Sequence, residues 1–261
     1  MATADAAADL HVSRDGYVGL IEIDRPPHNF FDHDLIRRIA DAADAFDRDG
    51  ETRAVVLAAT GTAFCAGARF GENAPAGGAQ ATRPGALYRE AVRLFRVGIP
   101  LVAAVHGAAT GGGLGLALAC DFRVACPEAR FWANFTALGF HPGFGLSVTL
   151  PEVVGRQQAA LMFYASRRTG GEEAYRIGLA DVLVAREEVR GAALALAAGI
   201  AANAPLAVRE TRATQRAGLA DRVEAILERE LEVQTRLRAT EDFAEGVAAV
   251  NERRPANFRG R

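Results

Sequence analysis

The sequence predicts an α/β fold with a helical C-terminal region, and three observations support this. Strand-length apolar runs alternate with helical periodicities through the first half of the 261 residues, which favours a sheet packed against helices. From about Ala204 onward the periodicity is wholly helical. Hydrophobic residues make up 50% of the chain, enough to bury a substantial core in one large domain.

The N-terminal elements follow from local patterns. Residues 17–24 alternate well enough for a strand that ends at a Pro-Pro pair, and the AVVLAA run at residues 54–59 predicts a second, buried strand. Apolar residues on one face predict helices over residues 34–46 and 86–97. Residues 71–85 are rich in Gly, Ala and Pro, so we expect a loop beside a site.

The stretch of residues 101–121 is the one around which the chain is organised. It predicts a buried strand at residues 101–105, a turn at the Gly111-Gly112-Gly113 triplet and a buried helix at residues 114–119. The triplet interrupts an uncharged run that would otherwise suggest a membrane span, which needs about 20 helical residues. The first amides of a helix lack partners within the helix, so the triplet predicts a site for an anion or an oxyanion. The alternative is that the glycines form only a hinge that lets the helix pack on the strand.

This triplet does not fit a dinucleotide-binding loop. Counted from Gly111 or Gly113, the third position of G-x-G-x-x-G/A falls on Leu116 or Leu118. No GK[ST] sequence follows for a phosphate loop either. The spacing therefore gives no reason to expect a nicotinamide or nucleotide cofactor.

Beyond the central stretch, the pattern adds short strands and a glycine-rich loop. Residues 122–125 and 130–132 are strand-like, and residues 181–184 are a weaker strand candidate. The sequence GFHPGFG at residues 139–145 predicts a loop that leads into a helix. Helices are expected over most of the remaining chain.

Composition excludes several classes of function. The formal net charge of −2 argues against a nucleic-acid footprint, and all 30 basic residues are Arg, which removes lysine Schiff-base chemistry. Cys65, Cys120 and Cys126 fit no zinc spacing and predict reduced thiols in a cytoplasmic protein. The acidic N-terminus lacks the basic region of a signal peptide. Histidines and aspartates cluster at residues 28–34 without metal-ligand spacing, and no G-x-S-x-G sequence occurs, so we expect neither a metal nor an α/β-hydrolase.

Four blocks, in order, carry a resemblance to a known family. They are IDRPPHN at residues 23–29, RAVVLAATGTAFCAGA at 53–68, VAAVHGAATGGGLGLALACDFRVA at 102–125 and ATEDFAEGVAAVNERRP at 239–255. Together they resemble the enoyl-CoA hydratase/isomerase (crotonase) superfamily over nearly the whole chain.

This resemblance implies a crotonase-like spiral of ββα units. Residues 1–200 would form the core with the acyl-CoA site, and residues 201–261 would form a helical region for packing and oligomerisation. It also implies a homotrimer or hexamer and an acyl-CoA substrate, with coenzyme A as part of the substrate and no separate cofactor. Neither a nucleic acid nor a membrane is an expected partner.

In proteins of this family two backbone amides bind the thioester oxygen, and the resemblance places them at Ala68 and Gly112. For Gly112 the helix-start argument reaches the same conclusion independently. The resemblance further implies substrate contacts, which we assign to Arg25, His28, Ala66, Arg69 and Phe135.

Three positions depart from the family pattern. Hydratases carry glutamates at the positions of Gly115 and Phe135, and many isomerases carry an acid at the position of Gly143. Addition of water by two glutamates is therefore not expected for this chain.

Few acid–base candidates remain. His141 lies in the predicted pocket loop and has a pKa range suited to proton transfer, although a turn residue bonded to backbone is the alternative. Arg69 could pair with a substrate carboxylate or phosphate, or be a solvated surface residue. Glu72 in the glycine-rich loop could swing toward the site.

The sequence leaves two hypotheses that assign the protein to different functional classes. The first is an enzyme that acts on an acyl-CoA through an enolate, by hydration or isomerisation with His141 as acid or base, or by decarboxylation or hydrolysis. For decarboxylation, Arg69 would hold the departing carboxylate. The second is a catalytically silent acyl-CoA-binding member, favoured by the empty positions Gly115, Phe135 and Gly143.

Overall fold

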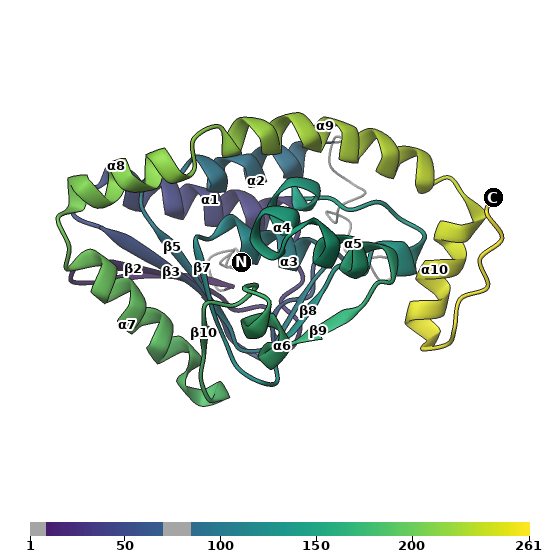
Figure 1. Cartoon of the computed structure of the whole chain (residues 1–261), viewed down its shortest axis with the longest axis horizontal. Helices are drawn as coiled ribbons and strands as arrows, with labels where there is room; N and C mark the ends of the chain where they lie inside the picture. The colour runs from purple at the N-terminus through teal and green to yellow at the C-terminus, as the bar shows by residue number, and fades with distance from the viewer. Residues whose placement is uncertain (1–8, 70–84) are drawn as a thin grey trace, which may run out of the picture.

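The computed structural model describes residues 9–69 and 85–261 (Figure 1). Glu72 and nearly all of the predicted loop at residues 71–85 lie outside these ranges. The described chain forms two sheets covered by helices, which confirms the predicted α/β class.

The larger sheet has six strands in the order β1-β2-β3-β5-β7-β10. Its central strands are all buried, and the parallel pairing of β3 with β5 explains why their sequences are continuous apolar runs. Only β1 and β2 pair antiparallel. The strands span β1 Leu10–Asp15, β2 Val18–Ile23, β3 Ala54–Ala59, β5 Leu101–Val105, β7 Phe122–Ala125 and β10 Val182–Leu183.

The smaller sheet has the order β4-β6-β8-β9, with bounds Ala63–Cys65, Ala108–Thr110, Arg130–Trp132 and Arg168–Gly170. Three times in succession the chain leaves a strand of the larger sheet, forms one strand of the smaller sheet and then turns helical. This repetition is the predicted spiral of ββα units. Gly107 allows successive turns of the spiral to pack closely. A Cβ at this position would lie 2.2 Å from the Thr62 carbonyl oxygen, so only glycine fits.

Helices cover both faces of the larger sheet. α1 (His33–Arg48) begins at Asp32, whose carboxylate accepts a hydrogen bond from the Leu35 amide, and it packs on α2 (Ala86–Arg96). α7 (Val189–Ala201) packs on β3 and β5. α3 (Gly112–Ala119) is buried almost completely, and it begins two residues before the predicted helix. The remaining core helices are η1 Thr136–Leu138, α4 Leu146–Val154, α5 Arg156–Tyr164, α6 Gly171–Arg176 and η2 Arg186–Glu188.

The predicted C-terminal helices are α8 (Pro205–Gln215), α9 (Leu219–Leu237) and α10 (Glu241–Glu252). Figure 1 shows α8 and α9 running along one side of the molecule past α1 and α2, with α10 at the far end. Asp121 holds this region to the core, because its carboxylate accepts hydrogen bonds from the Leu101 amide, Arg212 and Arg216. α9 also packs on α2 and α4, and this contact brings it to the cavity described below.

No single helix in residues 9–69 and 85–261 is long and apolar enough to cross a bilayer. Two helical segments, residues 186–201 and 205–215, have the length and composition of a membrane span only when they are taken together. A bend of 106° separates them. In the central stretch that raised the question of a span, the uninterrupted helix has eight residues.

Candidate active site

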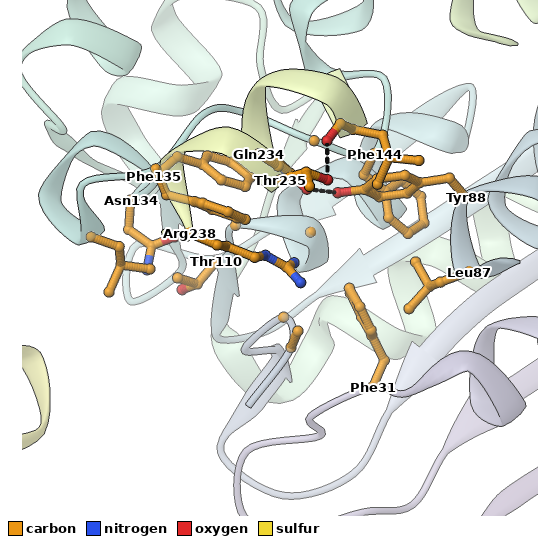
Figure 2. Close-up of a pocket in the computed structure, with 18 of the residues that line it drawn as sticks. Phe31, Leu87, Tyr88, Thr110, Asn134, Phe135, Phe144, Gln234, Thr235 and Arg238 are labelled. Carbon is orange, nitrogen blue, oxygen red and sulfur yellow. Dashed lines mark hydrogen bonds between the residues drawn. The ribbon is translucent and has the colours of Figure 1, made fainter. Parts of the chain in front are cut away.

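A cavity of about 480 Å³ lies where three strands of the smaller sheet end, and α2 and α9 close it (Figure 2). β4, β6 and β8 are parallel neighbours, so their carboxyl ends bring residues 66–68, 110–112 and 134–135 to one edge. The volume falls within the range of about 300–1,000 Å³ typical of small-molecule sites. Most of the wall is aromatic or aliphatic.

Two of these segments touch at Gly67. A Cβ on Gly67 would lie 2.7 Å from the Thr110 carbonyl oxygen and 3.4 Å from the Gly112 nitrogen, and its φ of +81° also favours glycine. Backbone hydrogen bonds hold the 66–68 segment in place, from the Phe31 amide to the Gly67 carbonyl (3.0 Å) and from the Ala66 amide to the His28 carbonyl (3.0 Å). The close approach therefore sets the Ala68 and Gly112 amides beside one cavity.

Neither of these two amides donates a hydrogen bond to any other group within residues 9–69 and 85–261. Gly111 explains this for Gly112, because its φ of +55° turns the chain out of β6 and makes Gly112 the first residue of α3. The helix dipole adds partial positive charge at the same point. The Ala68 and Gly112 amides can both donate hydrogen bonds to an oxygen that becomes negative during a reaction.

The cavity brings together four of the eight residues predicted for the site: Ala66, Ala68, Gly112 and Phe135. The other four are not among its lining residues, and their roles stay predictions. Arg25 pairs with Asp9 and Asp32, and the His141 Nδ1 lies 2.8 Å from the Pro142 carbonyl oxygen. His28 and Arg69 are exposed, each beside the Phe30 ring.

The positions of the two hydratase glutamates are filled by aromatic packing. A Cβ on Gly115 would lie 2.6 Å from the Phe144 Cβ, so α3 can pack on Phe144 only if residue 115 has no side chain. Phe135 is buried in the cavity wall and stacks on Phe140, with ring centroids 6.4 Å apart. The described wall therefore has an apolar surface where these carboxylates would stand.

At the isomerase position, a Cβ on Gly143 would lie 2.2 Å from the Tyr88 hydroxyl oxygen and 2.4 Å from the Gln234 Nε2. Those two side chains form a chain of hydrogen bonds in its place, and Figure 2 shows the first of these bonds, between Tyr88 and Gln234. The Tyr88 hydroxyl donates to the Gln234 Oε1 (2.6 Å), and the Gln234 Nε2 donates to the His141 carbonyl (3.0 Å). Burial raises the pKa of Tyr88, so the phenol stays neutral.

Helix α9 contributes three polar side chains at four-residue spacing that were not predicted from the sequence. Glu230 accepts hydrogen bonds from the Gly145 amide (2.9 Å) and the Ser147 amide (3.0 Å), which fixes the loop before α4. Gln234 and Arg238 follow on the same helical face and line the cavity. Polar residues repeating every four positions among the apolar residues of this helix were the available signal.

No Asp, Glu, His or Cys lines the cavity among the described residues. Cys65 lies next to this wall, but burial raises the pKa of its thiol to about 12, so it is not a ready nucleophile. Within the described ranges no group of His, Cys, Asp and Glu side chains could hold a metal ion. The titratable side chains of the described lining are Tyr88 and Arg238.

Two backbone amides beside one largely apolar cavity, on a spiral of ββα units, are suited to bind a carbonyl compound and to stabilise an oxyanion. Comparison with known proteins specifies the class. The chain belongs to the enoyl-CoA hydratase/isomerase family, which it matches over residues 13–261.

Individual relatives agree with this assignment. The chain is 32% identical to a crotonyl-CoA hydratase of Syntrophomonas wolfei, with 97% of this chain and 98% of the relative covered. It is 30% identical to a short-chain-enoyl-CoA hydratase of Clostridium acetobutylicum, with 93% and 94% covered. A crystal structure of an enoyl-CoA hydratase/isomerase from Pseudoalteromonas atlantica superposes with a TM-score of 0.86 at 30% identity, covering 96% of this chain and 100% of that one. Family membership makes this chain an enzyme of hydratase/isomerase type that acts on acyl-CoA thioesters.

Proposed function

We propose that the thioester oxygen of the substrate lies between the Ala68 and Gly112 amides. Both amides lack partners among the described residues and adjoin one cavity, which supports this position. As the α-carbon gains electrons, the oxygen becomes an enolate oxyanion and both hydrogen bonds strengthen. One such donor is worth about 2.7–4 kcal/mol in the transition state.

We further propose that the reaction is loss of CO₂ from a 2-carboxyacyl-CoA. The observation that carries this proposal is the lining of the cavity, where the described residues include neither a carboxylate nor an imidazole. Addition of water or migration of a double bond needs such a group to move a proton. In decarboxylation the bond between the α-carbon and the carboxylate breaks instead, its electron pair enters the enolate, and water then protonates the α-carbon.

The test is a turnover assay with malonyl-CoA, methylmalonyl-CoA and crotonyl-CoA. We expect CO₂ and the shortened acyl-CoA from the first two, with little hydration of crotonyl-CoA. Rapid hydration of crotonyl-CoA without CO₂ release would overturn the proposal. Loss of that hydration in Glu72→Ala would then identify Glu72 as the missing base.

A second candidate is a catalytically silent acyl-CoA-binding member. The filled positions beside Gly115 and Gly143 favour it, because they exclude the family's carboxylates and no described lining residue supplies another. Calorimetry would then detect acyl-CoA binding, while none of the three substrates would turn over.

We also propose a homotrimer or hexamer located in the cytoplasm, with coenzyme A entering only as part of the substrate. The family resemblance supports the assembly, and the three unpaired, buried cysteines are consistent with a reducing compartment. Light scattering coupled to size-exclusion chromatography would measure the mass. A monomer at micromolar concentration would contradict the proposed assembly.

A further inference from the structure

Arg238 is the one cation among the described residues that line a mostly apolar cavity. It caps the C-terminus of α9, and Figure 2 shows its guanidinium group pointing into the cavity. The guanidinium carbon lies over the Phe140 ring, 5.0 Å from its centre, in the range of a cation–π contact. The partial negative charge at the helix end favours a cation there.

What distinguishes Arg238 is that its side chain lacks a polar partner among the described residues. Within residues 9–69 and 85–261 its side chain forms no ion pair or hydrogen bond, and its Nε is buried and unsatisfied. Burial lowers the pKa of Arg238, as expected for a charge removed from water without a counter-ion. Arg238 is half-buried, so an anion that pairs with it would offset the cost of removing part of its charge from water.

The polar side chains that α9 places beside Arg238 already have hydrogen-bond partners, and so does Tyr88. Tyr88 donates to Gln234, and Gln234 donates to the His141 carbonyl. The Thr235 hydroxyl donates to the Leu231 carbonyl (2.8 Å). Arg238 is therefore the side chain of this α9 face whose donors remain available to a bound molecule.

From this geometry we infer that Arg238 binds a carboxylate on the acyl group, so that the substrates are monothioesters of dicarboxylic acids with coenzyme A. The guanidinium fork matches the two oxygens of a carboxylate. It shares one cavity of about 480 Å³ with the Ala68 and Gly112 amides, whereas the phosphates of coenzyme A are separated from the thioester by the whole pantetheine arm. This inference rests on the proposed position of the thioester in the cavity.

Thioether analogues test the inference without turnover, because they lack the thioester carbonyl. Calorimetry would compare S-alkyl-CoA with S-(ω-carboxyalkyl)-CoA of matched length, with chains of increasing length to locate the carboxylate. We expect the carboxylate to tighten binding by about 10- to 100-fold at one preferred length, the range of a charge-assisted hydrogen bond. A short optimum would place the charge on the carbon next to the thioester, and a long one would place it at the end of the chain.

Three variants show whether Arg238 is the cause. Arg238→Gln should abolish the preference for the carboxylate, and Arg238→Lys should keep part of it as a point charge. Arg236→Gln is the matched control, because Arg236 is exposed on the same helix, and it should change nothing. Thermal unfolding of each variant establishes that the fold is retained.

The possible failures are distinguishable. If alkyl-CoA binds but the carboxylate adds nothing, or if Arg238→Gln keeps the preference, this inference is overturned and the proposed function stands. If Arg238→Gln weakens binding of free coenzyme A, the guanidinium holds the nucleotide phosphates and the inference is again overturned. If neither series binds and crotonyl-CoA, which keeps the thioester carbonyl, does not bind either, the proposed position of the substrate is wrong as well.

Discussion

Phe144 occupies the space into which a side chain at Gly115 would project, with 2.6 Å between the Phe144 Cβ and a Cβ built on Gly115. Phe144 adopts a φ of +61°, a left-handed conformation that is uncommon for an aromatic residue. Its ring is buried and lies beside Phe31, with centroids 5.8 Å apart. This packing gives a physical reason for the missing glutamate.

The first prediction concerns this pair. Gly115→Ala would gain about 1 kcal/mol of helix propensity, but overpacking against Phe144 costs about 1–3 kcal/mol, so we expect net destabilisation. In a Phe144→Gly background the contact atoms are gone, and the same change should become neutral or stabilising. Urea denaturation of the parent, both single variants and the double variant measures the coupling. Additive effects would show that the two residues do not compete for space.

The second prediction concerns His141. Its main-chain carbonyl accepts the hydrogen bond from Gln234, and its side chain is not part of the cavity lining. His141→Ala keeps that carbonyl, so we expect turnover to change little. If His141 instead transfers a proton, the turnover rate of the same variant would fall by about 10²- to 10⁴-fold while thioester binding stayed intact. Steady-state kinetics together with calorimetry separate these outcomes.

Much of the fold could be predicted from the sequence, because the long elements carry strong periodicity. β3, β5, α1 and α2 lie within two residues of their expected bounds. The short strands β4, β6 and β9 were not predicted, although β8, which also has three residues, was; three residues carry a weak pattern, and their pairing depends on distant neighbours. β1 is polar and exposed, and its only local signal was the Asp15-Gly16 turn that joins it to β2.

The residues of the site likewise divide into those that the sequence could predict and those that it could not. The position of Gly112 at a helix start follows from a local rule, and Ala66, Ala68 and Phe135 came from the family resemblance. Tyr88, Gln234 and Arg238 could not be placed by either route, because only tertiary packing brings α2 and α9 to the cavity. The reach of a side chain such as His141 depends on rotamer and loop geometry, which spacing along the chain does not determine.

The third prediction concerns pH and the C-terminal residues. Hydrogen bonds from Arg254 lower the pKa of Glu245 to about 2, and the Asn257 amide (2.7 Å) adds to this. Because the folded-state pKa is depressed, the contact is fully present above the ordinary glutamate pKa of about 4.3 and is lost as the pH falls toward 2. Hydrogen exchange at residues 254–261, corrected for intrinsic rates, should therefore show reduced protection over that interval.

Glu245→Gln is the control for this pH effect. It removes the titrating group, so the same residues should have low protection at every pH. Equal protection of the parent protein at both ends of the interval would mean that the ion pair does not hold the C-terminal segment.

The last prediction tests the oxyanion hole through Gly112. Proline is tolerated at the first position of a helix, where its missing N–H breaks no helical hydrogen bond, so Gly112→Pro removes the donor amide selectively. A Cβ on Gly112 would lie 2.4 Å from the end of the Phe31 ring, so the change is made in a Phe31→Leu background. We expect turnover to fall by about 10²–10³ relative to Phe31→Leu alone, the cost of losing one oxyanion donor. Gly112→Ala in the same background is the matched control, because it adds a side chain but keeps the amide and should retain most of the activity. Steady-state kinetics measures the turnover of each variant, and circular dichroism checks that each is folded. Equal activity of the proline and alanine variants would exclude Gly112 as the donor.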